Sequence, residues 1–170
     1  MSAAMFDAIE QHLEERRAYI TQVALTLANL QQSPIEDKLG LAFLTHPLAA
    51  LPFISVQTEM PEPRRCGFYI IPQLRIGSYR ADFALVIQTD GYSFRLAVEC
   101  DGHDFHEKTK EQAAHDKARD RFFLERGWPV MRFTGSEIHR DAPKCANQAM
   151  DFLLRAIAKH EGKEHTLGAL

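Results

Sequence analysis

Residues 79–101 read Y-R-A-D-F-A-L-V-I-Q-T-D-G-Y-S-F-R-L-A-V-E-C-D. Apolar residues alternate with other residues on both sides of Asp90-Gly91. An Asp-Gly pair between two such runs is the strongest short-range indication of a β-hairpin. The sequence therefore predicts two antiparallel strands with Asp90 and Gly91 as the two turn residues, and residues equally distant from this turn face each other.

This register sets two acidic residues side by side. Asp82 falls opposite Glu99, and Arg80 falls opposite Asp101. Like charges directly opposite each other destabilise a sheet, and Arg80 lies one pair too far away to compensate Glu99. A divalent cation removes the repulsion, because Mg²⁺ and Mn²⁺ take oxygen ligands, often only one or two carboxylates. The hairpin therefore predicts a metal site at Asp82 and Glu99, with Asp101 two residues further on.

The same alternation assigns side chains to the two faces of the hairpin. Asp82, Glu99 and Asp101 share one face with small apolar residues. The opposite face is expected to be apolar throughout and to carry Tyr79, Ala81, Phe83, Leu85, Ile87, Phe94, Leu96, Val98 and Cys100.

The flanking segments predict an α/β (α+β) domain. Apolar residues near a 3.6-residue period predict a helix over 5–30. Ser33, Pro34 and Glu36 have the spacing of a capping box that opens a second helix, and His46-Pro47 ends it. The remaining predicted elements are strands at 53–58 and 68–76, a helix at 108–126, a strand at 128–133, a helical turn from Thr134 and a helix at 143–159. This order predicts a central mixed β-sheet flanked by helices.

Length and composition place the chain among globular proteins. Its 170 residues, 45% hydrophobic and 25% charged, predict a single domain: an N-terminal helical extension at 1–32, a core at 33–160 and a frayed tail at 161–170. The net charge of −3 argues against coating nucleic acid by bulk charge, although it permits a local basic groove.

Two further features bear on location. The three cysteines lie far apart without zinc-site spacing, which predicts reduced thiols in a cytoplasmic protein. The N-terminus does not have the pattern of a signal peptide, and no apolar stretch approaches the roughly 18 residues of a membrane helix. We therefore expect no membrane partner.

Three segments together resemble the restriction-endonuclease-like PD-(D/E)xK superfamily: Y-R-A-D-F-A-L, V-E-C-D-G-H-D-F-H and A-A-H-D-K-A-R-D-R-F-F-L-E-R-G-W-P-V-M-R-F. The likeness is greatest to the branch related to very-short-patch repair endonucleases, often described only as domain of unknown function 559. It covers about residues 33–155. The resemblance implies a core of helix, three-stranded meander, helix and strand, which agrees with the element order above, and it implies DNA as the substrate.

The resemblance also implies a metal site. Asp82 and Glu99 match the family's Mg²⁺ ligands, and Glu36 matches a helix glutamate that often completes the site. The capping box alone already accounts for Glu36, so both interpretations of this residue stay open. Asp101 is a further candidate ligand, because it follows Glu99 by two residues. It also stands where the family's motif has a lysine.

That departure leaves the positive charge of the motif unassigned. Lys117 or Arg119, one helix later, is the candidate replacement. His103 or His106 is the candidate for a base or an extra ligand, and a structural role for both histidines stays open.

Two functions remain in competition. One is a metal-dependent endonuclease that hydrolyses DNA phosphodiester bonds with Mg²⁺ (or Mn²⁺), in repair, restriction or mobile-element maintenance. The alternative is a catalytically inactive nuclease-like domain that binds nucleic acid or a protein partner, which the missing lysine and the pI of 6.2 favour. The helix at 5–30 either covers a sheet edge or forms the surface of a homodimer.

Overall fold

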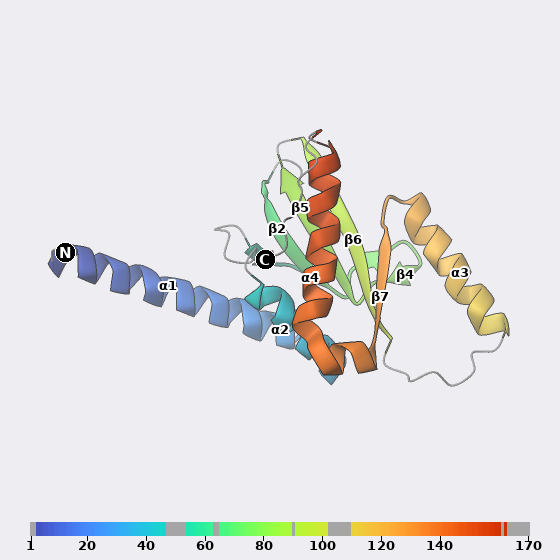
Figure 1. Ribbon diagram of the computed structural model, residues 1–170, viewed down its shortest axis with the longest axis horizontal. Helices are drawn as coiled ribbons and strands as arrows, with labels where there is room; N and C mark the ends of the chain where they lie inside the picture. Colours follow the sequence, from blue (N-terminus) through green and yellow to red (C-terminus); the bar gives the residue numbers. More distant parts are fainter. Residues whose placement is uncertain are drawn as a thin grey trace.

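A mixed sheet forms the centre of the computed structural model, which describes residues 3–46, 54–62, 65–89, 91–101, 110–160 and 162. Its five strands run in the order β1-β2-β5-β6-β7 (Figure 1). The outer pairs β1–β2 and β6–β7 are parallel, whereas β2, β5 and β6 are antiparallel neighbours. The strands are β1 (Ile54–Val56), β2 (Gly67–Pro72), β5 (Phe83–Thr89), β6 (Tyr92–Asp101) and β7 (Val130–Thr134). The predicted α/β fold with a central mixed sheet is confirmed.

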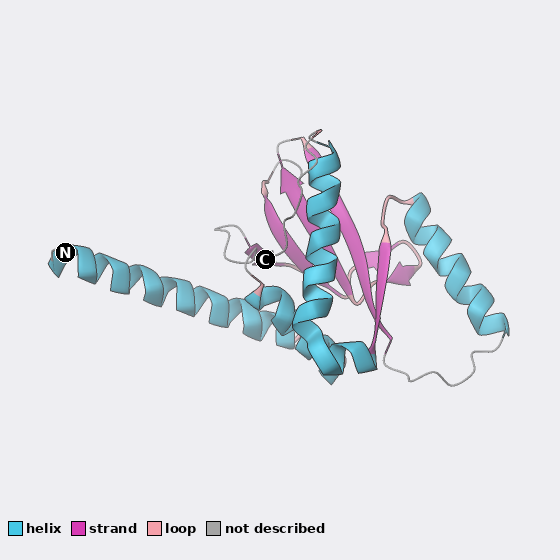
Figure 2. Cartoon of the chain, in the orientation of Figure 1, coloured by secondary structure: helices cyan, strands magenta, loops and turns pink. Residues whose placement is uncertain are grey.

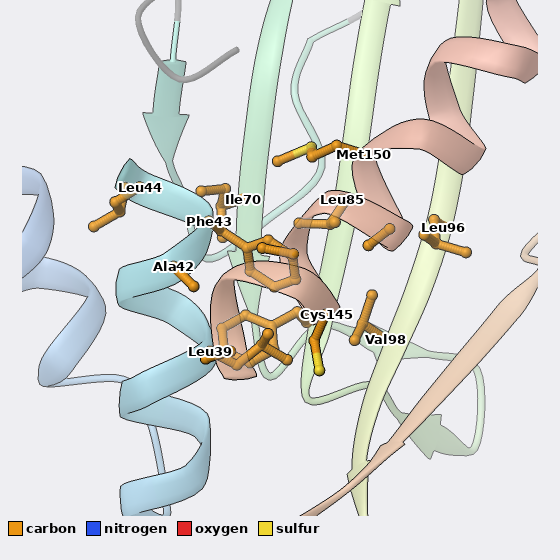
Figure 3. Packing of buried hydrophobic residues seen from close by; sticks show 14 of the residues in the cluster. Leu39, Ala42, Phe43, Leu44, Ile70, Leu85, Leu96, Val98, Cys145 and Met150 are labelled. Atoms are coloured by element: carbon orange, nitrogen blue, oxygen red, sulfur yellow. The ribbon is translucent and has the colours of Figure 1, made fainter. Parts of the chain in front are cut away.

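Helices cover both faces of this sheet (Figure 2). On one face, α2 (Pro34–Thr45) and α4 (Gly135–His160) bury Phe43 and Met150 against sheet residues such as Leu85, and Figure 3 shows these side chains meeting. On the other face, α3 (Lys110–Glu125) buries Phe123 beside Val86. Because both faces are covered, β5 is almost continuously buried, as expected for a strand between two helical layers.

The central hairpin has the predicted register. Phe83 faces Val98 at one end of the ladder and Thr89 faces Tyr92 at the other, as an Asp90-Gly91 turn requires. Gly91 has a φ of 87°, a left-handed conformation that glycine adopts without steric cost. Asp90 itself lies outside the described residues.

The predicted alternation fails at the start of the hairpin. The apolar face from Phe83 onward packs under α2 and α4 as expected, but Tyr79 and Ala81 pack in the opposite cluster with Val86. The reason is a change of direction before β5. A two-stranded sheet of β3 (Arg75–Ile76) and β4 (Tyr79–Arg80) forms there, and the N–H of Ala81 donates to the carbonyl oxygen of Leu74 at 2.9 Å.

The predicted pairing of Arg80 with Asp101 is therefore wrong. Arg80 faces Arg75 in the β3–β4 pair, and its guanidinium donates to Oε1 of Gln32 at 2.8 Å. Asp101 faces Thr134 of β7 instead.

The helix boundaries follow local signals. Ser33 caps α2, with Pro34 in its first turn, and the helix ends at Thr45 with His46 as its C-cap. The predicted turn from Thr134 and the predicted helix at 143–159 belong to one element, α4, which is broken at Asp141 (φ −157°, ψ 75°). Of the tail predicted to fray, only residue 162 is described.

The N-terminal helix α1 (Ala3–Ala28) confirms the predicted extra helix. Figure 1 shows it extending away from the sheet and the other helices. Its C-terminal part contacts the core, where Val23 and Leu27 are buried. Within the part of the chain that the structure describes, no helix is both long and apolar enough to span a bilayer.

Candidate active site

Asp82 and Glu99 lie at the same end of the central hairpin. The last pair of the β5–β6 ladder is Phe83 and Val98, and Asp82 and Glu99 are their immediate neighbours in the chain. Asp82 precedes β5, and its Oδ2 accepts a hydrogen bond of 2.7 Å from the backbone N–H of Cys100. That bond fastens Asp82 to β6 beside Glu99, so the structure brings the two predicted ligands together.

Glu99 is almost completely buried, with 3% of its surface exposed. Burial raises the pKa of Glu99 to about 7; the charges of Asp82 and Asp101 act in the same direction, and Arg119 and Arg132 oppose them. Oε2 accepts a hydrogen bond from Arg119, while the buried Oε1 has no hydrogen-bond partner in the structure as described. Near neutral pH this group is therefore divided between its charged and neutral forms.

Asp82 shares this environment. Burial is the main cause that raises its pKa, and repulsion by Glu36 adds to it; the hydrogen bond from the N–H of Cys100 and the charges of Arg119 and Arg80 lower it. The carboxylate of Asp82 is thus electrostatically coupled to the acidic residue in α2 and to the one in β6.

The thiol of Cys100 lies near all of these acidic residues. Burial raises the pKa of its thiol, and four carboxylates raise it further: Asp82, Glu36, Glu99 and Asp101. The four predicted metal ligands therefore all lie within electrostatic range of one point of β6, although they come from α2, β6 and the segment before β5.

Glu36 combines a capping role with a position at this site. It is 6% exposed. Oε1 accepts a hydrogen bond from Oγ of Ser33 at 3.0 Å, and Oε2 accepts from the N–H of Gln32 at 2.9 Å and from Nε2 of Gln73 at 2.7 Å. The capping contact within α2 is confirmed, and the contact from Gln73 directs the same carboxylate toward the sheet.

Gln73 is a residue that the sequence analysis missed. Its side-chain amide donates to Glu36, and its backbone N–H donates to the carbonyl oxygen of Asp82 at 2.9 Å, so Gln73 bridges two acidic residues of the site. It has a φ of 56°, which is uncommon for a residue with a side chain. Its Oε1 is buried and has no hydrogen-bond partner among the described residues. No signal marks it in the sequence, because an amide after Pro72 is an ordinary loop residue.

Arg119 brings a positive charge to the site. Its Nη2 donates to Oε2 of Glu99 at 2.6 Å and to the carbonyl oxygen of Arg80 at 2.7 Å. Its guanidinium carbon lies 5.9 Å from the ring centre of Tyr79 and 5.6 Å from that of Phe123. Of the two predicted replacements for the motif lysine, the structure brings Arg119 to the carboxylates.

Lys117 is not part of this contact. Lys117 is exposed and makes no hydrogen bond or ion pair within the described ranges. His103 and His106 lie outside the described residues, so their roles stay predictions.

Asp101 is neutralised from β7. Its Oδ1 lies 3.8 Å from Nη1 of Arg132, whose Nη2 contacts Oδ1 of Asp120 at 2.5 Å. Arg132 is also the register partner of Glu99 across β6 and β7. The cation beside Asp101 is therefore Arg132, and not Arg80 as the hairpin register predicted.

The donor set suits a divalent cation that is completed by substrate. In the described ranges, no three His, Cys, Asp or Glu side chains are close enough together to form a ready metal cage. Mg²⁺, however, commonly binds through one or two carboxylates plus water and substrate phosphate. Asp82 and Glu99 provide such a pair, and Oε1 of Glu99, which has no hydrogen-bond partner among the described residues, is a buried oxygen that a cation or a donor would satisfy.

The mixed sheet and the helices that cover it are consistent with a restriction-endonuclease-like core. The chain belongs to the family REase_MTES_1575, whose model matches residues 60–153, more than half of its length. The match includes Asp82, Glu99 and Arg119 and begins after Glu36. No curated protein and no solved structure matches the chain. The nearer likeness to very-short-patch repair endonucleases stays a prediction.

Proposed function

We propose that this protein is a metal-dependent endonuclease that hydrolyses phosphodiester bonds of DNA. The observation that carries the proposal is the state of Glu99: it is 3% exposed, lies beside Asp82, and has one oxygen on Arg119 and the other without a partner in the described structure. A buried, partly unsatisfied acidic residue with a raised pKa is typical of functional sites. The family match supports a nuclease.

In this proposal, Asp82 and Glu99 hold Mg²⁺ or Mn²⁺, with Glu36 and Asp101 as further acidic residues around it. A metal held there would lower the pKa of a bound water and polarise the scissile phosphate. Glu36 is already held by three hydrogen bonds. We therefore assign it to fixing the site's geometry and negative potential rather than to the main ligation.

Arg119 takes the part of the missing motif lysine. Its guanidinium can contact a carboxylate and a phosphate oxygen at the same time. It is anchored by the carbonyl oxygen of Arg80 and lies near the rings of Tyr79 and Phe123. A cation held in place before the reaction stabilises the charge that develops on the phosphate without reorganising. Lys117 and the two histidines, His103 and His106, are the further candidates for proton transfer or phosphate contact.

A second candidate function has its own support. Asp101 replaces the motif lysine, and Arg119 forms an ion pair with a proposed ligand. A nuclease-like domain in which Arg119 permanently neutralises Glu99 would bind nucleic acid or a protein partner without cleaving. In that case Arg119 substitutes for the metal.

A nicking assay with supercoiled plasmid tests the leading proposal. The purified full chain is incubated with Mg²⁺, with Mn²⁺ or with a chelator, and conversion to open-circular and linear DNA is followed. We expect metal-dependent nicking that Asp82→Asn and Glu99→Gln each reduce by at least about 100-fold, while Glu125→Gln, on the exposed surface of α3, keeps full activity.

Titration calorimetry with Mn²⁺ alone separates the two functions. Heat of binding that Asp82→Asn abolishes, together with nicking, supports the endonuclease. Metal binding without nicking of supercoiled, linear or single-stranded DNA overturns the endonuclease proposal. Absence of both metal binding and nicking supports the inactive domain, in which Arg119 takes the place of the metal.

A further inference from the structure

The helix α1 carries an apolar stripe that continues beyond the point where the helix leaves the core. Val23 and Leu27 belong to the buried cluster that α2 shares. Leu13 and Ile20 precede Leu27 at successive steps of seven residues, yet they are 58% and 40% exposed. Every side chain that the structure describes between residues 7 and 22 is exposed, and Figure 1 shows this part of α1 standing away from the rest of the protein.

A helix in that position lacks the contacts that usually stabilise helices. Most helical stability in proteins comes from packing of an apolar face rather than from the helix alone. Two helices pack along a common seam when two positions of each heptad face the partner; Leu13 and Ile20 occupy one of these positions, and the other position between them is an arginine in the sequence. The exposed stripe is therefore suited to another helix.

The charges beside the stripe favour a second copy of α1 in antiparallel orientation. Glu10 and Arg17 lie seven residues apart on the same edge of the stripe, with opposite charges. When two identical helices pair antiparallel, this edge of one helix meets the same edge of the other, so Glu10 meets the partner's Arg17, twice by symmetry. In a parallel pair the edge would meet the opposite edge of the partner, which carries His12 and Tyr19 and offers no carboxylate to Arg17.

We propose that α1 is a dimerisation element that pairs with α1 of a second copy of this chain, antiparallel, through Leu13 and Ile20. The proposal does not depend on the nuclease function. The interface is isologous, and the two folded cores lie at opposite ends of the paired helices, because each core is attached at the C-terminal end of its own α1.

Sedimentation velocity of the full chain over a wide range of concentrations tests this directly. We expect the wild type to sediment as a dimer at high concentration and to dissociate on dilution, because the paired segment is short. The double variant Leu13→Asp/Ile20→Asp is expected to stay monomeric at every concentration. The matched control is Leu25→Asp: Leu25 is 57% exposed on the same helix but on the opposite face, so dimerisation should persist.

Charge variants test the orientation. Glu10→Arg and Arg17→Glu are each expected to raise the dimer dissociation constant about tenfold, because each converts both symmetric ion pairs into like-charge contacts. The double variant should restore the wild-type constant. Circular dichroism of each variant verifies that the core remains folded.

Three outcomes would overturn the proposal. The first is a wild type that is monomeric at all concentrations, and the second is a loss of dimer in Leu25→Asp equal to that in the double Asp variant. The third is failure of the charge-swapped double variant to restore association, which would exclude the antiparallel pairing.

Discussion

Arg119 in α3 donates a hydrogen bond of 2.6 Å to the carboxylate of Glu99 in β6. The pair is mostly removed from solvent, with side chains 21% and 4% exposed. The carbonyl oxygen of Arg80 holds the same nitrogen of Arg119 at 2.7 Å, so the guanidinium is fixed between α3 and the sheet. A buried carboxylate is costly unless it is paired. Arg119 is therefore the group that allows Glu99 to ionise near neutral pH.

The raised pKa of Glu99 predicts that metal-free protein loses stability as pH rises. The unfolded chain releases this proton near pH 4.5 and the folded protein near pH 7. Between these values the folded state binds more protons than the unfolded state, so the free energy of unfolding falls as pH increases through that window. We expect a loss of up to about 3 kcal/mol between pH 4.5 and 8. Denaturant unfolding at a series of pH values measures it.

Glu99→Gln isolates this contribution. Its unfolding free energy should depend less steeply on pH over the same window and should exceed that of the wild type at pH 8. Glu125→Gln, at an exposed position of α3, should follow the wild-type curve. A Glu99→Gln profile as steep as that of the wild type would show that other groups cause the pH dependence.

Removing Arg119 is expected to destabilise the protein in a pH-dependent manner. At pH 8, Arg119→Ala leaves the buried charge of Glu99 without its partner, and because Glu99, with a pKa of about 7, can take up a proton instead, this costs at most about 1.4 kcal/mol more than at pH 5. At pH 5, Glu99 is protonated and the cost should be smaller. Lys117→Ala, which removes an exposed side chain two residues earlier in α3, should change stability by less than about 0.5 kcal/mol.

A double-mutant cycle distinguishes the pair from general packing. In Glu99→Gln/Arg119→Ala the two effects at pH 8 should be non-additive by about 1–3 kcal/mol. Additive effects would mean that Arg119 stabilises the fold through Tyr79 and Phe123 rather than through Glu99.

The features predicted correctly from the sequence depend on interactions between residues that are close in the chain. The register of β5 and β6 followed from the Asp-Gly turn and the alternation of apolar residues, and the contact between Ser33 and Glu36 followed from capping-box spacing. Both depend on residues close together in the chain. The acidic pair was predicted from the register alone, because extending the ladder by one position places Asp82 against Glu99.

The errors arose where the chain changes direction without a sequence signal. Neither Gly nor Pro marks the step between β4 and β5, so the alternation was extended through Ala81 and placed Arg80 against Asp101. In the structure Arg132 of β7 takes that position. The choice of Arg119 over Lys117 depended on how α3 lies across the sheet, which no local pattern encodes. Gln73 was missed because its role depends on backbone conformation rather than on charge.

Gln73 provides a test in which the backbone and the side chain can be separated. Its φ of 56° is unfavourable for any residue with a Cβ, whereas glycine adopts it readily. Gln73→Gly should therefore be more stable than Gln73→Ala by about 1 kcal/mol. Both variants lose the hydrogen bond to Glu36, so their difference reports the backbone alone. Thermal unfolding of the two proteins measures this difference.

The side chain of Gln73 should matter for the metal site rather than for stability. Groups that orient the acidic residues of a metal site typically contribute tenfold or more in metal affinity. We expect Gln73→Gly to weaken Mn²⁺ binding about tenfold, measured by calorimetry, while its unfolding temperature stays close to that of the wild type. Gln73→Glu should also weaken Mn²⁺ binding, because it places a second carboxylate against Glu36. In this variant the free energy of unfolding should depend more strongly on pH than in the wild type. If Gln73→Gly binds Mn²⁺ as tightly as the wild type, the bridge from Gln73 to Glu36 is structural only.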